Sequence, residues 1–385
     1  MTRRVVIVGG GIAGLSTAAA LRAGGFGGEL TIIDAGDFPH DRPPLSKDFL
    51  AGTRSAGDIA LQAEAWYDTQ SIRLITRSTA TALRPAEGRV ELACGTTLPA
   101  DRVVLAMGGR AVRPRIPGAC GPLVHVLRCV SDAVRLRDAL KPGARVLVVG
   151  AGLIGAEVAS TAVRLGCQVT LADPVSPPLA AVLGGEVASW LHAVHAEHGI
   201  KLVASAVPTL DAADADVVLL ATGMVPVTAL AGMAGINADQ GIIVDHGQVT
   251  SNPAVLAAGD CCRLRDEAPA GHWEAAQTAG QRAAASILAT PAPARTAPWF
   301  WTDRHGMHVE VTGRLEPDTP TIVRGQFGKP PFAVFAVRHG KVAGAVTVND
   351  PNAARTARRL IDGGAAADPE RLADPATSLR SLLRR

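Results

Sequence analysis

The sequence lacks any apolar run long enough to cross a membrane, although hydrophobic residues make up 48% of its 385 positions. A membrane-spanning helix needs about 20 consecutive apolar residues. The longest apolar stretches here, such as residues 217–225, have the length of buried strands. Thr2-Arg3-Arg4 is a basic start of the kind found in export signals, but a strand and a glycine loop follow at once. We therefore expect neither a membrane span nor an export signal.

Cysteine is scarce, and its spacing fits no metal or disulfide pattern. None of the six cysteines belongs to a Cys-x-x-Cys or Cys/His ligand motif. We therefore expect no zinc site, no other metal site and no disulfide framework. This favours a reducing, cytoplasmic location.

The chain also lacks a strong excess of charge. Lys and Arg number 38 against 35 for Asp and Glu, and aromatic residues, only 3% of the chain, are not interleaved with basic runs. Binding to nucleic acid is therefore not expected. The length allows two or three domains with a large buried core, and the composition predicts a soluble protein.

What the sequence does contain is a nucleotide-binding pattern. Val5–Val8 is apolar on both faces, as a strand of a parallel sheet must be. Gly9-x-Gly11-x-x-Gly14 follows, and its glycines allow a tight turn that brings backbone amides close to a pyrophosphate. A helix then starts, and the next strand finishes at Asp34, where a carboxylate can accept hydrogen bonds from ribose hydroxyls.

The same layout returns in the middle of the chain. Residues 146–149 lead into Gly150-x-Gly152-x-x-Gly155, a helix, and a second strand that ends at Asp173. Glycines that merely punctuate turns would explain one loop, but they do not explain two ordered series of strand, loop, helix, strand and acidic residue. Two dinucleotide sites in one chain favour an electron relay, in which one nucleotide delivers electrons to another that is held permanently.

Asp173 also bears on the choice of pyridine nucleotide. A carboxylate at this point favours a free 2′-hydroxyl and repels a 2′-phosphate. Residues 174–179 contain no arginine that could receive such a phosphate. The sequence therefore predicts NADH in preference to NADPH.

Further motifs resemble those of a known family. Residues 250–260, TSNPAVLAAGD, resemble the second FAD signature of glutathione-reductase-like flavoproteins. Residues 41–48, DRPPLSKD, resemble a loop of the NADH-dependent ferredoxin reductases that serve oxygenases and cytochromes P450. Shorter matches run nearly end to end, at residues 105–109, 127–133, 221–223, 272–274, 299–303, 349–351 and 371–374. The resemblance implies an α/β fold with two Rossmann-like dinucleotide-binding domains of the glutathione-reductase type and a small α+β C-terminal domain.

The resemblance also implies where FAD binds. Ala80 would line the adenine through its backbone, Asp260 would hold the ribitol, and Trp273 would pack beside the isoalloxazine. The other implied FAD contacts are Gly9, Gly11, Ile12, Ala13 and Gly14 at the pyrophosphate, Asp34 near the adenosine ribose, Arg42 and Lys47 along the cofactor, Arg128 at the domain junction, and Gly259 beside Asp260.

The second cradle would hold NADH. Its implied residues are Gly150, Gly152, Leu153, Ile154, Gly155, Glu157, Asp173 and Gly223. Three residues are candidates for a catalytic role: Lys47 at the flavin end, Glu157 as an acceptor for the nicotinamide carboxamide, and Trp273. Each also has a purely structural interpretation, because loop lysines are usually solvated, a carboxylate in the first helical turn stabilises the helix dipole, and a single tryptophan is usually core. Arg128 could likewise be an ordinary helix-end arginine.

The FAD domain would be discontinuous. It would consist of residues 1–110 and 235–298, with the NAD domain inserted at 111–234 and the C-terminal domain following at 299–385. In the last domain, alternation predicts strands over 308–311, 332–337 and 342–348 and then a helix over 353–361. Residues 73–107 have room for a β-meander, whereas only residues 205–216 separate the corresponding strands of the NAD domain. A hairpin is therefore predicted to be missing there.

These features together predict a flavoenzyme. NADH would give a hydride to FAD, and electrons would pass singly to a [2Fe-2S] or other small ferredoxin that feeds an oxygenase or a cytochrome P450. Residues 38–54 contain no cysteine, which disfavours disulfide reductases and single-cysteine peroxidases. An acceptor such as oxygen, a quinone or a small molecule stays open, and so does a non-catalytic nucleotide-binding role. The oligomeric state is not predicted.

Two sets of residues bear on the acceptor. Ala275 and Ala279 stand where the family pattern has Asn and Gln, and Arg304 stands where it has Gln, so the acceptor or the flavin potential is expected to differ. A basic rim that would attract an acidic ferredoxin could be formed by Arg263, Arg265, Arg282, Arg304 and Arg338.

Overall fold

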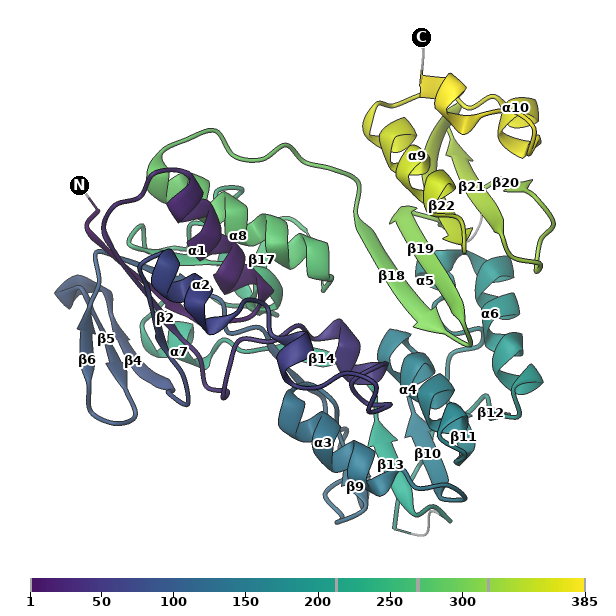
Figure 1. The fold of residues 1–385 in the computed structure, drawn as a ribbon, viewed down its shortest axis with the longest axis horizontal. Coiled ribbons are helices and arrows are strands. Elements are labelled where there is room, and N and C mark those ends of the chain that lie inside the picture. The colour runs from purple at the N-terminus through teal and green to yellow at the C-terminus, as the bar shows by residue number, and fades with distance from the viewer. Residues whose placement is uncertain (1, 212–213, 268–270, 317–318, 384–385) are drawn as a thin grey trace. The chain divides into compact units, whose positions relative to one another are not determined.

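The computed structural model describes residues 2–211, 214–267, 271–316 and 319–383 (Figure 1). The chain divides into two compact units. Unit 1 comprises residues 1–42, 55–110 and 224–294, and unit 2 comprises residues 43–54, 111–223 and 295–385. The short segment 43–54, which carries Lys47, therefore belongs to unit 2. The predicted boundaries of three domains stay a prediction.

Unit 1 is built on a five-stranded parallel sheet with the order β16-β7-β1-β2-β3. Side chains of its central strand alternate between two cores: Val5 and Ile7 join one apolar cluster, and Val6 and Val8 join the other. Burial on both faces explains why the strand is continuously apolar. The strands in that order are Val255–Ala257, Arg102–Leu105, Arg4–Val8, Glu29–Ile33 and Ile72–Ile75.

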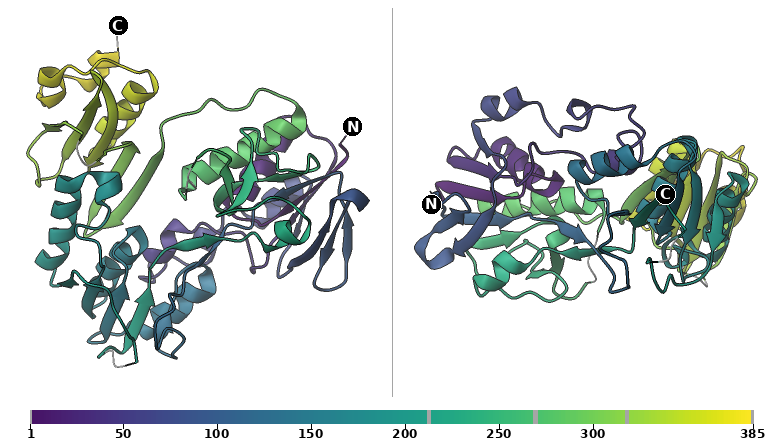
Figure 2. Two further views of the ribbon diagram at one scale, coloured as in Figure 1. Left: turned by 180° about the vertical axis from the view of Figure 1, so that it is seen from behind. Right: turned by 90° about the horizontal axis from the view of Figure 1, so that it is seen from below.

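Helices α1 (Ile12–Ala23) and α8 (Trp273–Leu288) lie side by side on one face of this sheet (Figures 1 and 2). Gly280 allows their close approach, because a Cβ atom at this position would lie 2.2 Å from the carbonyl oxygen of Ala13. The first and last segments of unit 1 therefore pack backbone against backbone.

The remaining elements of unit 1 are short. An antiparallel sheet contains β4 (Ala80–Arg84), β5 (Arg89–Leu92) and β6 (Thr97–Pro99), and β15 (Ile242–Val244) pairs with β17 (Cys262–Leu264). β8 (Gly109–Ala111) pairs with β14 (Met224–Pro226). The other helices are α2 (Glu64–Thr69) and α7 (Ala229–Met233), with 3-10 turns at Gly57–Ile59, Pro85–Glu87 and Gly259–Cys261.

Unit 2 contains a second five-stranded parallel sheet, with the order β12-β11-β10-β13-β9. Residues 204–211 and 214–216, the described part of the β12–β13 connection, contain no strand, which confirms the predicted loss of a hairpin. The strands in that order are Lys201–Val203, Gln168–Ala172, Arg145–Val149, Val217–Leu220 and Val124–His125. The helices are α3 (Val130–Ala139), α4 (Leu153–Arg164), α5 (Ala180–Leu183) and α6 (Gly185–Glu197), with a 3-10 turn at Pro43–Ser46.

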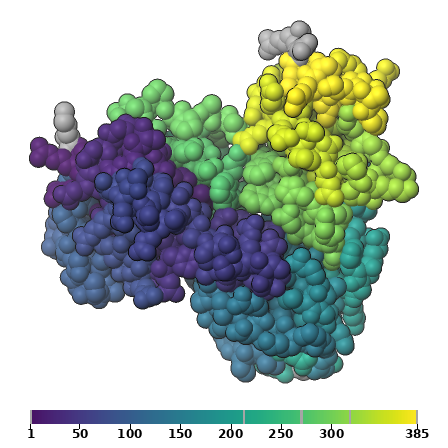
Figure 3. Space-filling view, viewed as in Figure 1, coloured from purple at the N-terminus to yellow at the C-terminus, as the bar shows by residue number. Residues whose placement is uncertain are grey.

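The C-terminal part of unit 2 is an antiparallel sheet with the order β18-β19-β22-β21-β20. Phe332 and Val334 pack with side chains of α5 and α6 on one face, while Ala333 and Phe335 pack under α9 on the other. In Figure 3 the yellow C-terminal residues lie directly against the yellow-green residues that precede them. The elements are β18 (Trp299–Arg304), β19 (Met307–Gly313), β20 (Thr321–Arg324), β21 (Phe332–Arg338), β22 (Lys341–Val348), α9 (Pro351–Asp362), α10 (Pro369–Ala373) and a 3-10 turn at Leu379–Leu383.

The three predicted strands and the helix of this part are present, with β18 and β20 in addition. Throughout the described residues, no helix combines the length and the apolar character that a membrane span requires.

Candidate active site

The first glycine loop connects β1 to α1 at the carboxyl end of the sheet. The direction in which successive strands are added changes at β1, because β2 lies on one side of it and β7 on the other. Gly9 has φ +110°, and a Cβ atom there would lie 2.2 Å from the Ala106 carbonyl oxygen. A Cβ atom at Gly14 would lie 2.0 Å from the Gly9 carbonyl oxygen. At Gly11, in contrast, only the Arg42 side chain would come within 4 Å, at 3.9 Å. The middle glycine therefore faces the open space that a pyrophosphate would enter.

Asp34 fixes the conformation of this loop. Its Oδ2 accepts a hydrogen bond from the Gly10 amide at 2.7 Å, and its Oδ1 accepts one from the Gly36 amide at 2.7 Å. Helix α1 starts at Ile12 with Gly11 as its N-cap and without a side-chain cap. First-turn amides of a helix have no intrahelical acceptor, so this end is suited to an anion.

The second loop, between β10 and α4, repeats these contacts. Gly150 has φ +103°, and a Cβ atom at Gly155 would lie 1.9 Å from the Gly150 carbonyl oxygen. A Cβ atom at Gly152 would meet no described atom within 4 Å. Asp173 accepts through Oδ2 from the Ala151 amide at 2.7 Å and through Oδ1 from the Val175 amide at 2.8 Å. Ile154 is 41% exposed beside the loop, which suits contact with a nucleotide.

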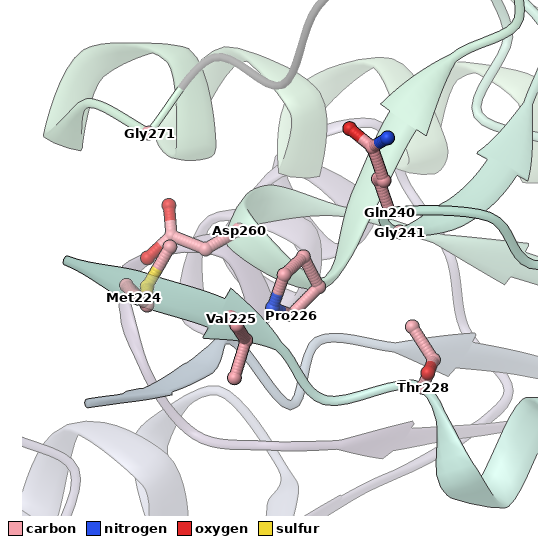
Figure 4. Close-up of a pocket in the computed structure, with 8 residues that line it drawn as sticks. All are labelled: Met224, Val225, Pro226, Thr228, Gln240, Gly241, Asp260 and Gly271. Carbon is pink, nitrogen blue, oxygen red and sulfur yellow. The ribbon is translucent and has the colours of Figure 1, made fainter. Parts of the chain in front are cut away.

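Arg42 and Trp273, two further predicted FAD residues of unit 1, contact the acidic side chains of Asp260 and Asp41. Arg42 Nη1 lies 3.7 Å from Asp260 Oδ2, and Trp273 Nε1 donates to Asp41 Oδ1 at 2.7 Å. Asp260 and Met224 project into one cavity of about 370 Å³ (Figure 4). Its other lining residues are Val225, Pro226, Thr228, Gln240, Gly241 and Gly271. A glycine cradle and an acidic residue at the edge of a cavity fit FAD.

Lys47 and Glu157 form a buried ion pair in unit 2. Lys47 Nζ lies 2.9 Å from Glu157 Oε2, and the exposed fractions of the two side chains are 14% and 5%. Ser46 Oγ donates to Glu157 Oε2 at 2.5 Å, and Thr302 Oγ1 donates to Oε1 at 2.8 Å. Lone pairs of both carboxylate oxygens are therefore engaged, which satisfies the buried charge.

Ser46 and Thr302 were not predicted as site residues. Ser46 sits next to Lys47 in the proline-stiffened loop, and Thr302 is an inward position of β18, whose burial alternates residue by residue. No apolar alternation in the sequence of Trp299–Arg304 marks Thr302 as inward, because polar residues occupy two of the three inward positions.

The remaining predicted residues occupy separate positions. Ala80 begins β4 in unit 1. In unit 2, the Arg128 amide donates to Asp132 Oδ2 ahead of α3, and the carbonyl of Gly223, which has φ +110°, accepts from the Val112 amide. Unit 1 thus holds the first glycine cradle with Asp34, Arg42, Ala80, Asp260 and Trp273, and unit 2 holds the second cradle with Lys47, Arg128, Glu157, Asp173 and Gly223.

Arg304 does not belong to an exposed basic rim, and that prediction is wrong. Its side chain is buried, with Nη1 3.4 Å from His195 Nε2. Burial lowers the pKa of Arg304 to about 10, and the nearby Glu157 opposes the shift. The physical reason is strand register: Phe300, Thr302 and Arg304 alternate inwards along β18. Of the other proposed rim residues, Arg263 pairs with Asp239 and Arg338 pairs with Glu316.

Two comparisons of sequence identify relatives. Residues 3–283 match the family described as pyridine nucleotide-disulphide oxidoreductase, and residues 299–383 match the reductase C-terminal family. The ferredoxin–NAD(+) reductase component of the anthranilate 1,2-dioxygenase system from Burkholderia cepacia is 36% identical over 400 residues and covers 98% of each chain. Putidaredoxin reductase from Pseudomonas putida is 33% identical, covering 98% of this chain and 96% of the relative.

A solved structure shows the same fold. The reductase in the covalent putidaredoxin reductase–putidaredoxin complex superimposes with a TM-score of 0.93 at 30% identity, covering 99% of this chain and 98% of the other. This likeness confirms the predicted fold class and the predicted resemblance.

Proposed function

Because the chain belongs to the pyridine nucleotide-disulphide oxidoreductase family, we propose that it is an NADH-dependent flavoenzyme that delivers single electrons to a small ferredoxin, of the [2Fe-2S] type, for an oxygenase or a cytochrome P450. The observation that carries this proposal is the pair of equivalent glycine cradles, each fixed by an aspartate. One cradle suits a resident FAD and the other a visiting NADH. The ferredoxin–NAD(+) reductase names of the relatives support the same assignment.

The protein's contribution is to bind and orient the two nucleotides. FAD, when bound, supplies the chemistry that turns a two-electron hydride donor into a source of single electrons. In unit 1 the loop amides of Gly11–Gly14 would hold its pyrophosphate and Asp260 its ribitol. In unit 2 the loop amides after Gly150 would hold the NADH pyrophosphate, with Asp173 excluding a 2′-phosphate by charge repulsion.

Lys47 and Glu157 would act at the reacting ends of the nucleotides. Their charges are mutually compensated and largely removed from water, and three donors hold Glu157 in one orientation. A preorganised charge pair of this kind needs no reorganisation when charge moves nearby.

Six free thiols support a reducing, cytoplasmic location, because none of the cysteines is joined in a disulfide.

The proposed function is tested by spectroscopy of the purified protein. We expect a yellow protein whose flavin absorbance bleaches when NADH is added without oxygen, and bleaches far more slowly with NADPH. Addition of a ferredoxin should restore the absorbance while reducing the ferredoxin.

Three results would contradict the proposal. A colourless protein that does not take up FAD, or absence of bleaching with either nucleotide, would favour a binding protein without turnover. If the flavin absorbance recovered only with air or a quinone, the electron acceptor would be oxygen or a quinone and not a ferredoxin.

A further inference from the structure

The Asp41 carboxylate joins two segments of unit 1 that are far apart in the sequence. Asp41 Oδ1 accepts a hydrogen bond from Trp273 Nε1 at 2.7 Å, although the two residues are 232 positions apart. Arg42, the next residue, has its Nη1 atom 3.7 Å from Asp260 Oδ2. Two neighbouring side chains of the first segment therefore reach two side chains of the last segment. Arg42, Asp260 and Trp273 are predicted cofactor contacts, whereas Asp41 has no assigned role.

Backbone hydrogen bonds hold Asp41 in place. Its amide donates to the Ile59 carbonyl oxygen at 2.8 Å, and the Leu61 amide donates to the Pro39 carbonyl oxygen at 3.1 Å. These two bonds flank an antiparallel bridge centred on His40. A side chain on a hydrogen-bonded support keeps its position better than one on an unsupported loop. The acceptor of the indole hydrogen bond is therefore fixed.

The donor is fixed as well, because Trp273 is the first residue of α8. Gly280 brings this helix against α1. A Cβ atom at Gly259 would lie 2.8 Å from the Cβ atom of Ala13 and 3.5 Å from that of Ala276. The first turn of α8, to which Ala276 belongs, therefore lies beside the first glycine loop and beside the Gly-Asp element.

The same end of α8 borders the cavity that contains Asp260. Gly271, which precedes the helix, lines this cavity together with Asp260 (Figure 4). Trp273 is half-buried, so part of its indole surface is available to a ligand. An indole has large apolar faces and one polar N–H group. Here Asp41 engages the N–H group, which leaves the ring faces for an aromatic partner.

A hydrogen bond at the edge of the ring determines how the indole is oriented. A tryptophan side chain has two rotatable bonds, and a fixed acceptor at Nε1 restrains both of them. The acceptor is a carboxylate, and hydrogen bonds to ionised groups are about twice as strong as those between neutral groups. Asp41 therefore has the position and the charge needed to hold Trp273 in one orientation.

We propose that Asp41 is a positioning residue for FAD and that it acts through Trp273. It holds the indole in the orientation in which the ring packs against the bound cofactor. Because the ring is ordered before the cofactor binds, less side-chain entropy is lost on binding. Asp41 itself makes no contact with FAD in this role. The inference rests on the proposed function, since it requires that unit 1 binds FAD.

The experiment is a double-mutant cycle on FAD binding. Fluorescence titration of the apoprotein gives the dissociation constant of FAD for the wild type, Asp41→Leu, Trp273→Phe and the double variant. We expect Asp41→Leu, which removes the acceptor, to weaken binding by about tenfold or more. In the Trp273→Phe background, which has no indole N–H group, the same substitution should change affinity by less than about twofold. Asp41→Asn, which keeps an oxygen acceptor without the charge, should weaken binding by about threefold.

Asp37→Leu is the matched control. Asp37 is an exposed aspartate of the same segment, and its partner is Arg77 at 2.7 Å. The affinity of this variant for FAD should equal that of the wild type. A loss as large as that of Asp41→Leu would show a general effect of charge in this segment and would overturn the positioning role. Equal losses from Asp41→Leu with and without the indole N–H group would overturn it too, because the carboxylate would then not act through Trp273.

A second readout needs no cofactor. In proton–nitrogen-15 spectra of the apoprotein, the Trp273 Nε1 proton should resonate downfield because of the carboxylate, and Asp41→Leu should remove that shift while Asp37→Leu keeps it. An unchanged resonance in Asp41→Leu would overturn the inference. If Asp41→Leu does not fold, Asp41→Asn takes its place in the cycle, and its smaller loss of affinity should disappear in the Trp273→Phe background.

The failure of this inference can be told apart from the failure of the proposed function. If Asp41→Leu bound FAD as tightly as the wild type and bleached with NADH, the positioning role would be overturned and the proposed function would stand. If the wild type took up no FAD, the proposed function itself would be removed.

Discussion

Nη1 of Arg304 lies 3.4 Å from Nε2 of His195, and both side chains are withdrawn from solvent. His305 joins the pair, with Nε2 2.8 Å from His195 Nδ1. The pKa of His195 is lowered to about 2. Burial is the larger cause and the positive charge of Arg304 is the next, because both disfavour the charged imidazole. Unit 2 thus contains a neutral histidine in contact with a buried cation.

We expect the protein to lose stability as the pH falls below about 6.5. An unfolded histidine binds a proton near pH 6.5, whereas folded His195 does so only at about pH 2. Between these values the unfolded state binds more protons, so stability is complete above about pH 6.5 and declines below it. At pH 5 the loss from His195 alone is about 2 kcal/mol.

Urea unfolding of the wild type and of His195→Gln at about pH 7.5 and pH 5 measures this effect. The free energy of unfolding of the variant should vary less between the two pH values. An identical pH dependence of both proteins would contradict the assigned role of His195.

We expect Arg304→Gln to leave stability at neutral pH unchanged or to raise it by about 1 kcal/mol. The Nε and Nη2 atoms of Arg304 are buried without a hydrogen-bond partner among the described residues, and replacing a poorly compensated buried charge is often neutral or stabilising. Removing the guanidinium also raises the pKa of His195, so the protein should tolerate acid better.

Arg338→Gln serves as the control for Arg304→Gln. Arg338 is exposed and paired with Glu316, so its replacement should change the free energy of unfolding by less than about 0.5 kcal/mol. If the free energy of unfolding of Arg304→Gln fell by about 3 kcal/mol or more, the buried charge of the guanidinium would be fully compensated by its surroundings in the folded protein.

We expect Gly152→Ala to weaken NADH binding without destabilising the fold. The added methyl group would meet no described atom within 4 Å, yet it would project where the pyrophosphate approaches the loop. Affinity for NADH, measured by fluorescence titration, should fall by about tenfold or more, which is about 1.4 kcal/mol. Gly185→Ala, which also adds a methyl group in open space of unit 2, should bind NADH normally. Equal affinities of the two variants would argue against the second cradle as the NADH site.

We expect Asp173→Asn to reduce the preference for NADH over NADPH by about tenfold. The substitution removes the negative charge that repels a 2′-phosphate, and it replaces one of the two oxygens that accept from the Ala151 and Val175 amides. Stability should therefore fall by about 1 kcal/mol as well. Asp138→Asn, an exposed position of α3, should change neither quantity. An unchanged ratio of the dissociation constants for the two nucleotides would refute the role of Asp173.

Much of the fold could be predicted because local signals agree with it. The strand–glycine–helix order fixes β1 with α1 and β10 with α4, since only glycine fits the positive φ at Gly9 and Gly150. The loss of a hairpin could be predicted from the shortness of the β12–β13 connection. β18 escaped prediction because Trp299–Arg304 carries polar residues at inward positions.

The site was less predictable than the fold, because its contacts join distant parts of the chain. Ser46 and Thr302 meet at Glu157 although they lie 111 and 145 residues from it. A sequence pattern reports neighbours within an element, whereas these contacts depend on how elements pack. Arg304 was misjudged for the same reason: a charged residue indicates a surface position unless its strand register is known.

The packing of α8 against α1 has a consequence for synthesis on the ribosome. Strand β16 and helix α8 complete the sheet and the helical layer of unit 1, so this unit cannot close until the chain has emerged past Leu288. The parallel sheet of unit 2 is contained in residues 124–220 and can form earlier. During translation, the strand and helix beside the first glycine loop therefore keep an uncovered apolar face, while the sheet of the second cradle is already assembled.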